Sequence, residues 1–401
     1  MKPMRCTVPN DGRPGYRPGS CHSITLALAI GLPAFTGQRL RGQDHADYRF
    51  HNYEEEAGRI RVETHSWFFE VAPHSAVTLS GEAVYDAISG ASPTGAPPPK
   101  GSNQVPLAPL KDEREAGNLS AAIRWLGNQT TTPQLAYSIE QDYESYGVSL
   151  THAIDLNQKN TTVSFGASYT YDEIFPTFWM GNKEYKNSAD FLMGVSQLLG
   201  PRTIFAANIT CGTSHGYLSD PYKRFRFSDY PLESVTFPEK RPGYREKQIG
   251  YLSLTHFFTP VNGSAELSYR IYHDSYEIVS HTVGVNWFQK LGRYVLVSPN
   301  CRFTDQSAAD FYAVQLRGDP TVSPNDPFAP HFPIPNYYSA DYRLSALQTF
   351  TYGVNVSVTI KEHVTLDLGY KRYEMFGTDN RTSASAYPKA NIFSAGLRVL
   401  F

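Results

Sequence analysis

The segment Asn391–Phe401 carries an apolar side chain at every second position and ends on an aromatic ring. The apolar positions are Phe393, Ala395, Leu397, Val399 and Phe401. Because successive side chains of a β-strand point to opposite faces, these residues form one apolar face. The pattern predicts a strand that lies against either lipid or the core of a soluble sheet.

A terminal strand of this kind, ending on Phe, resembles the closing strand of bacterial outer-membrane barrels. In those proteins the strand is also the signal read by the barrel-assembly machinery. The resemblance implies an assembly signal made of Phe393, Leu397, Val399 and Phe401. The alternative is a half-buried edge strand of a soluble sheet.

The same alternation recurs along the chain, for example in 163–171 and 350–360. In most of these segments the second face is polar or glycine, which is typical of a barrel with lipid outside and water inside. A membrane-spanning helix would need about 18 consecutive apolar residues, and the sequence has no such run. Aromatic residues make up 13% of the chain although its mean hydropathy is only -0.39.

The expected connections largely alternate between short and long. Long loops are expected at 89–113, 217–247 and 305–345, whereas two short connections, near 141–145 and 274–278, fall on the long-loop side. Short periplasmic turns and long extracellular loops are typical of transmembrane barrels. We therefore predict an all-β fold, a transmembrane antiparallel up-and-down β-barrel. An even total of about 16 strands requires Asp47–Tyr53 as the first strand and pairs it with the last.

The amino-terminal region predicts export. An apolar run, Ile24–Phe35, follows several basic residues and precedes small ones, so residues 1–37 are expected to form a signal peptide with a long leader. Residues 38–46 would be a short periplasmic lead-in, and 47–401 the barrel. The predicted location is the outer membrane of a Gram-negative-type bacterium. Its partners would be outer-membrane lipids and the assembly machinery, and the absence of a Lys/Arg cluster argues against nucleic acid.

Two cysteines remain after the leader, Cys211 and Cys301. They are expected on strands about four apart, roughly 20 Å from each other. A disulfide needs Cα atoms within about 7 Å, so both are predicted to be free thiols. No CxxC or CxxCH motif suggests a haem or thioredoxin-like centre, and no cofactor is expected.

Four segments, at 86–95, 112–117, 140–145 and 157–162, resemble a family of bacterial barrels known as domain of unknown function thirty-five-seventy. The resemblance implies an outer-membrane location without a settled activity. Genes of that family tend to lie near a small lipoprotein and a flavin-attaching transferase. The resemblance therefore implies a lipoprotein or a periplasmic redox protein as a partner. One departure is Glu113-Arg114-Glu115, where a simpler acidic-basic pair is expected.

The segment 86–95 is predicted to be a strand end that runs into a loop rich in Gly, Ser and Pro. Such a segment is typically a structured turn at a barrel rim. The alternative is a ligand or cation site that uses Asp86 and Ser89.

Charged residues on the polar faces are expected to line the lumen, where water or a partner charge solvates them. They are Arg61, Glu63, Glu82, Asp86, Arg124, Asp155, Asp172, Glu266, Arg270, Asp274, Asp367 and Lys371. Acids outnumber bases among them, which predicts a weak preference for cations. The alternative is that Glu266–Arg270 and Asp367–Lys371 are structural ion pairs.

The function favoured by these features is a porin-like channel for small solutes, with the proline-rich loop 305–345 folded over or into its mouth. One alternative is a scaffold barrel that holds a lipoprotein or redox partner in extracytoplasmic electron transfer. A second is a loop-borne hydrolase using Ser214, His215 and Asp220. The sequence shows no arrangement that would orient a base there, so the protein is not expected to be an enzyme.

Overall fold

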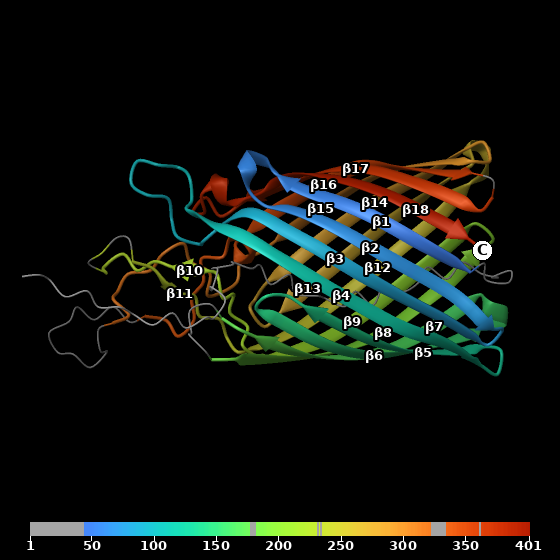
Figure 1. Ribbon diagram of the computed structural model, residues 1–401, viewed down its shortest axis with the longest axis horizontal. Coiled ribbons are helices and arrows are strands. Elements are labelled where there is room, and N and C mark those ends of the chain that lie inside the picture. The colour runs from blue at the N-terminus through green and yellow to red at the C-terminus, as the bar shows by residue number, and fades with distance from the viewer. Residues whose placement is uncertain (1–43, 177–181, 231, 233–234, 322–333, 361) are drawn as a thin grey trace, which may run out of the picture.

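The computed structural model describes residues 44–176, 182–230, 232, 235–321, 334–360 and 362–401. Sixteen of its strands form a closed antiparallel barrel in which each strand pairs with its neighbours along the chain (Figure 1). The barrel strands are β1 (His45–Glu55), β2 (Arg61–His74), β3 (Val77–Pro93), β4 (Leu107–Trp125), β5 (Gln129–Ile139), β6 (Tyr143–Leu156), β7 (Thr161–Ile174), β8 (Glu184–Gly200), β9 (Thr203–Gly216), β12 (Tyr244–Phe258), β13 (Gly263–Asp274), β14 (Val279–Leu291), β15 (Val295–Gln306), β16 (Leu347–Ile360), β17 (Val364–Gly377) and β18 (Lys389–Leu400). This confirms the predicted fold class. The predicted signal peptide and most of the lead-in lie outside the described residues.

The first and last strands close the barrel. β1 pairs with β18 in a continuous antiparallel register, in which Asp47 lies opposite Arg398. The Arg398 guanidinium donates to both oxygens of Asp47, at 2.8 and 2.7 Å. The predicted first strand is therefore confirmed, although it begins at His45 rather than at residue 47.

The outer face of the barrel carries the apolar side chains. Leu135, Ile209 and Leu397 are 64%, 63% and 39% exposed, as expected for side chains that face lipid. Cys211 and Cys301 are also exposed and free, as predicted from the separation of their strands. Among the described residues no helix is long and apolar enough to cross a membrane.

One expected loop is much shorter than predicted. β3 and β4 pair without interruption from Val77↔Ile123 to Pro93↔Leu107, so their connection is residues 94–106 rather than 89–113. The Gly, Ser and Pro residues of 89–93 did not end the strand because antiparallel pairing with β4 satisfies their backbone. The loop bounds at 217–247 and 305–345 shift less, since β12 begins at Tyr244 and β15 ends at Gln306.

The two longest connections fold together over one end of the barrel. We call their described residues, within 217–243 and 307–346, the cap. Its core contains Phe225, Phe227 and Ala340, packed against Tyr338 and other partly buried apolar side chains. A short hairpin of β10 (Arg224–Phe225) and β11 (Phe237–Pro238) belongs to it, at the left in Figure 1. Several prolines of the 305–345 loop fall in 322–333, outside the described residues.

Candidate functional site

A cavity of about 470 Å³ lies where the cap meets the barrel wall. We call it the vestibule. Basic side chains outnumber acidic ones among its lining residues. The bases are Lys186, Arg241, Arg245, Lys247, Arg270, Arg302 and Arg343, and the acids are Asp142, Asp220 and Asp341. The vestibule thus reverses the excess of acids expected from the sequence.

The roof of the vestibule is a buried network of ion pairs within the cap. Asp341 precedes the short helix η4 (Tyr342–Leu344) and accepts from the backbone N–H of Arg343 at 3.1 Å. It also accepts from the side chains of Arg343, at 2.9 Å, and Arg241, at 2.8 Å. Arg343 reaches Asp220 as well. The network joins the two loops of the cap, which are far apart in sequence.

Burial and charge act in opposite directions on two of the carboxylates in the roof, Asp341 and Glu239. Burial alone would raise the pKa of Asp341, but the charges of Arg343, Lys223 and Arg241 hold it well below its ordinary value. Burial raises the pKa of Glu239 despite the neighbouring Arg241 charge. Glu239 also accepts from the Ser339 hydroxyl at 2.5 Å. Asp341 therefore stays negatively charged at the centre of the roof.

Lys223 connects the cap to the barrel. Its side chain is fully buried, and Nζ donates to the carbonyl of Pro93, the last residue of β3, at 2.6 Å. Nζ also lies 5.6 Å from the centre of the Tyr342 ring. Burial lowers the pKa of Lys223. This contact anchors the cap at the end of β3, on the rim of the barrel.

Three bases of the vestibule wall are paired with carboxylates. Lys186 lies 2.9 Å from Asp172, and Lys247 lies 3.3 Å from Asp190. The Arg245 guanidinium forms an ion pair with a fully buried carboxylate, Asp274, and stacks 4.6 Å from the centre of the Tyr276 ring. These wall charges are largely compensated.

Arg270 and Arg302 differ from the other bases. Neither has a carboxylate partner in the part of the chain that the structure describes. Arg270 is half-buried on β13 and Arg302 is exposed to the cavity on β15, and their charges repel each other. The vestibule therefore presents two uncompensated guanidinium groups.

The remaining sequence-predicted lumen residues lie on the polar faces of their strands. Asp86 accepts from Thr64 and forms a 2.8 Å ion pair with Arg114. Asp172 accepts from Ser145 at 2.6 Å in addition to its contact with Lys186. The others have neutral hydrogen-bond partners or line the open lumen: Glu82 with Asn118, Asp155 with Thr162, Glu266 with Asn286, Asp367 with Ser357, Lys371 opposite Gly353, and Arg124 exposed near the β4–β5 turn.

Two expectations about these charges were wrong. The pairs Glu266–Arg270 and Asp367–Lys371 do not form among the described residues, since side chains four residues apart on one strand are separated by about 13 Å. Across-strand neighbours take their place. Arg61 and Glu63 were also expected in the lumen, but they share the outward parity of Trp67 and pair with each other.

The proposed ligand pair Asp86 and Ser89 is not brought together. Both residues lie within β3, three positions apart, so their side chains point to opposite faces. Asp86 is buried inside with Thr64 and Arg114, whereas Ser89 is exposed. The segment is a strand and not the turn that the sequence suggested.

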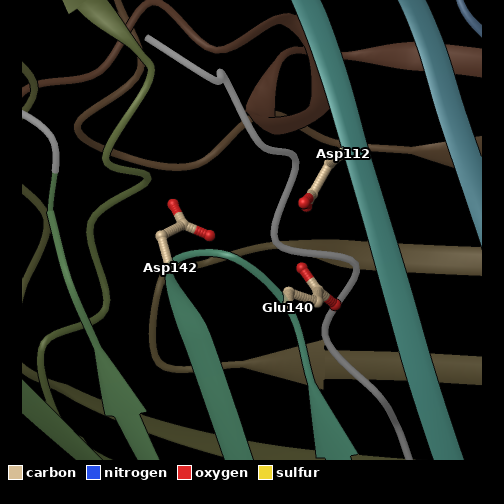
Figure 2. A group of neighbouring side chains, drawn as sticks. All are labelled: Asp112, Glu140 and Asp142. Carbon is tan, nitrogen blue, oxygen red and sulfur yellow. The ribbon is translucent and has the colours of Figure 1, made fainter. Parts of the chain in front are cut away.

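Three carboxylates that the sequence did not single out converge at the rim. Asp112 of β4 faces Glu140 and Asp142 of the β5–β6 turn, and their oxygens lie within 4.8 Å of one another (Figure 2). Asp142 also accepts from the Tyr222 hydroxyl of the cap. Carboxylate oxygens at this spacing suit a hard cation such as Ca²⁺. Asp112 and Glu140 lie in two of the segments that carry the family resemblance. That resemblance was the one sequence feature that could have drawn attention to these carboxylates.

The residues considered for hydrolysis do not converge. Ser214 is buried on the inner face of β9, where it contacts the Ser188 hydroxyl at 2.9 Å. His215 is exposed on the opposite face, because it is the next residue of the strand. Asp220 is bound to Arg343 in the roof. No catalytic dyad is formed by these three residues.

A closed barrel with apolar side chains outside and polar side chains inside defines an outer-membrane β-barrel protein. The chain belongs to the family described as "Protein of unknown function (DUF3570)", whose model matches residues 26–388. This confirms the resemblance found in the sequence. A search of curated proteins found no match.

Solved structures share the fold at low sequence identity. CdiB from Acinetobacter baumannii is 8% identical with a TM-score of 0.50, over 89% of this chain and 60% of that one. A bacterial polysaccharide outer membrane secretin is 8% identical with a TM-score of 0.49, over 90% and 100% of the two chains. The siderophore receptor PirA from Pseudomonas aeruginosa is 11% identical with a TM-score of 0.43. The match covers 90% of this chain but only 62% of the receptor.

Proposed function

We propose that this barrel is a channel for small solutes in the outer membrane. The observation that carries the proposal is the closed ring of sixteen strands around a polar interior. Barrels of about this size are wide enough to leave an aqueous path between their inward side chains. Charges such as Arg124 and Lys371, which line the interior, are tolerated where water solvates them.

The cap sets the size limit of the proposed channel. It covers the mouth with a buried ion network and an apolar core, so solutes must pass beside it through the vestibule. A cap in this position is expected to restrict the proposed channel to small solutes. We also propose that a leader in residues 1–37 exports the chain, and that the protein works without enzymatic chemistry.

Single-channel recording of the purified full chain in planar bilayers tests the proposal. The expected result is stepwise conductance in KCl from protein whose folded state is verified by heat-modifiable migration. A folded barrel that gives no conductance steps would overturn the channel. If such a silent barrel also co-purified with a lipoprotein or a redox protein, the scaffold function would replace it.

The carboxyl end of β18 is proposed to act in assembly. Phe401 is 70% exposed, and its backbone N–H donates to the carbonyl of Asp44 at 2.8 Å. Its side chain thus adds little to packing within the barrel. Deleting Phe401 is expected to reduce the amount of assembled barrel in outer membranes several-fold, while protein refolded in detergent keeps its thermal stability. Normal membrane levels of the truncated chain would contradict an assembly signal.

A further inference from the structure

We infer that Arg270 and Arg302 form a binding site for small anionic solutes, with carboxylate or phosphate groups as the recognised chemistry. The inference rests on the proposed channel and names the class of solute that its vestibule selects. It is carried by the uncompensated charge of these two residues in a cavity open to solvent.

The strand register places the two arginines on either side of β14. Arg270 of β13 lies opposite Thr282, and Arg302 of β15 lies opposite Gly284. The arginines are therefore separated by one strand, so their backbones lie roughly 10 Å apart at about 4.8 Å per strand, which two long side chains can span. Their guanidinium groups point into the same cavity and repel each other.

Small and hydroxyl-bearing residues separate the arginines. A Cβ atom at Gly284 would lie 2.7 Å from the Ser268 hydroxyl, so glycine leaves room for that hydroxyl on the β13 side. Thr282 contacts Thr304 through their hydroxyls at 3.0 Å. An anion held by both guanidinium groups would find hydroxyl donors at the same wall.

The contrast with the neighbouring bases identifies the site. Arg245, Lys247 and Lys186 each have a carboxylate within ion-pair distance, so their charges are satisfied by the protein itself. Two like charges that face one cavity across β14 repel each other unless a counter-charge joins them. A guanidinium presents its donors in a planar fork that matches the two oxygens of a carboxylate or phosphate.

The size of the vestibule limits the solute to a small molecule. A cavity of about 470 Å³ falls within the range of small-ligand sites, which is roughly 300–1,000 Å³. Citrate and inorganic phosphate are both small enough for this cavity. Citrate presents carboxylate groups, whereas phosphate presents phosphoryl oxygens. The two probes therefore separate a site for organic acids from a site for phosphate.

The test compares the double variant R270Q/R302Q with R124Q. Arg124 is also an exposed lumen arginine, but it lies at the opposite end of β4 from the cap, so its loss removes a lumen charge away from the vestibule. Calorimetric titration of the full chain in detergent with citrate, and separately with phosphate, measures binding. The double variant is expected to bind at least one probe about tenfold more weakly or worse, while R124Q binds as the wild type does.

Channel recordings give an independent readout. Under a KCl gradient the wild type is expected to favour chloride, and R270Q/R302Q is expected to lose that preference while still conducting. Equal binding and equal reversal potential in the wild type and the double variant would overturn the anion site and leave the channel intact. Absence of conductance with intact, arginine-dependent binding would overturn the channel and keep the site.

Discussion

The roof and the wall of the vestibule differ in whether their charged side chains have ion-pair partners. In the roof, Asp341 is almost fully buried, and the two arginines beside it share its carboxylate. In the wall, Arg270 and Arg302 face the cavity with no carboxylate partner among the described residues. Buried charges require partners, whereas hydrated charges do not. The roof charges therefore hold the cap together, and the wall charges remain available to a solute.

The largest expected effect comes from removing the roof altogether. Replacing residues 308–345 with a short turn joins β15 to β16 directly and removes Asp341, Arg343 and half of the apolar core of the cap. Single-channel conductance is expected to rise several-fold, because the mouth is no longer covered. Unchanged conductance in a folded variant would mean that the cap does not restrict the pathway, and that the vestibule lies beside the route rather than on it.

Neutralising the central carboxylate of the roof should loosen the cap without removing it. Asp341→Asn removes the carboxylate that Arg241 and Arg343 share. Because Glu239 and Asp220 still pair with these arginines, the cost is expected to lie below the roughly 3–5 kcal/mol of a broken buried pair. Proteolysis of the cap loops is expected to become much faster while the barrel remains intact. Asp310→Asn is the matched control, since Asp310 is an exposed aspartate of the same connection. Equal cleavage of the two variants would contradict a structural role for the roof network.

The smallest effect is a change in how the stability of the cap depends on pH. Burial lowers the pKa of Lys223, so between that value and about 10.4 the opened cap binds more protons than the closed cap. Closure is therefore expected to strengthen as pH rises through this range. Lys223→Met should abolish that rise. Cleavage of the cap at several alkaline pH values, corrected for protease activity on an unfolded substrate, measures it. A rise that persists in Lys223→Met would assign it to another group.

The strands could be predicted from the sequence because lipid imposes a period of two on their outer faces. Even the short segment Asp47–Tyr53 was placed correctly, since closing the ring needed one more strand to pair with β18. The limits of β3 could not be predicted. Its Gly, Ser and Pro residues favour a turn locally, and only pairing with β4 shows that they continue the strand.

Partners in the lumen and cap were harder to predict because they depend on register and on distant contacts. Asp86 was assigned to the lumen but its partner Arg114 was not, since they meet only when β3 and β4 are aligned. Arg302 could have been found from the apolar alternation of 297–303 around it. The roof could not, because Glu239 and Ser339 are 100 residues apart and no periodic pattern links them.

The β3–β4 hairpin contains the longest strand of the barrel, β4. Its two strands contain 17 and 19 residues, whereas about 9–11 suffice to cross a bilayer. The surplus stands above the membrane as a raised rim, with Lys111, Glu113 and Glu115 exposed on its outer face. A neighbouring protein in the membrane would therefore meet charged side chains at this part of the rim. The contact of Lys223 with the Pro93 carbonyl places the cap against this same hairpin.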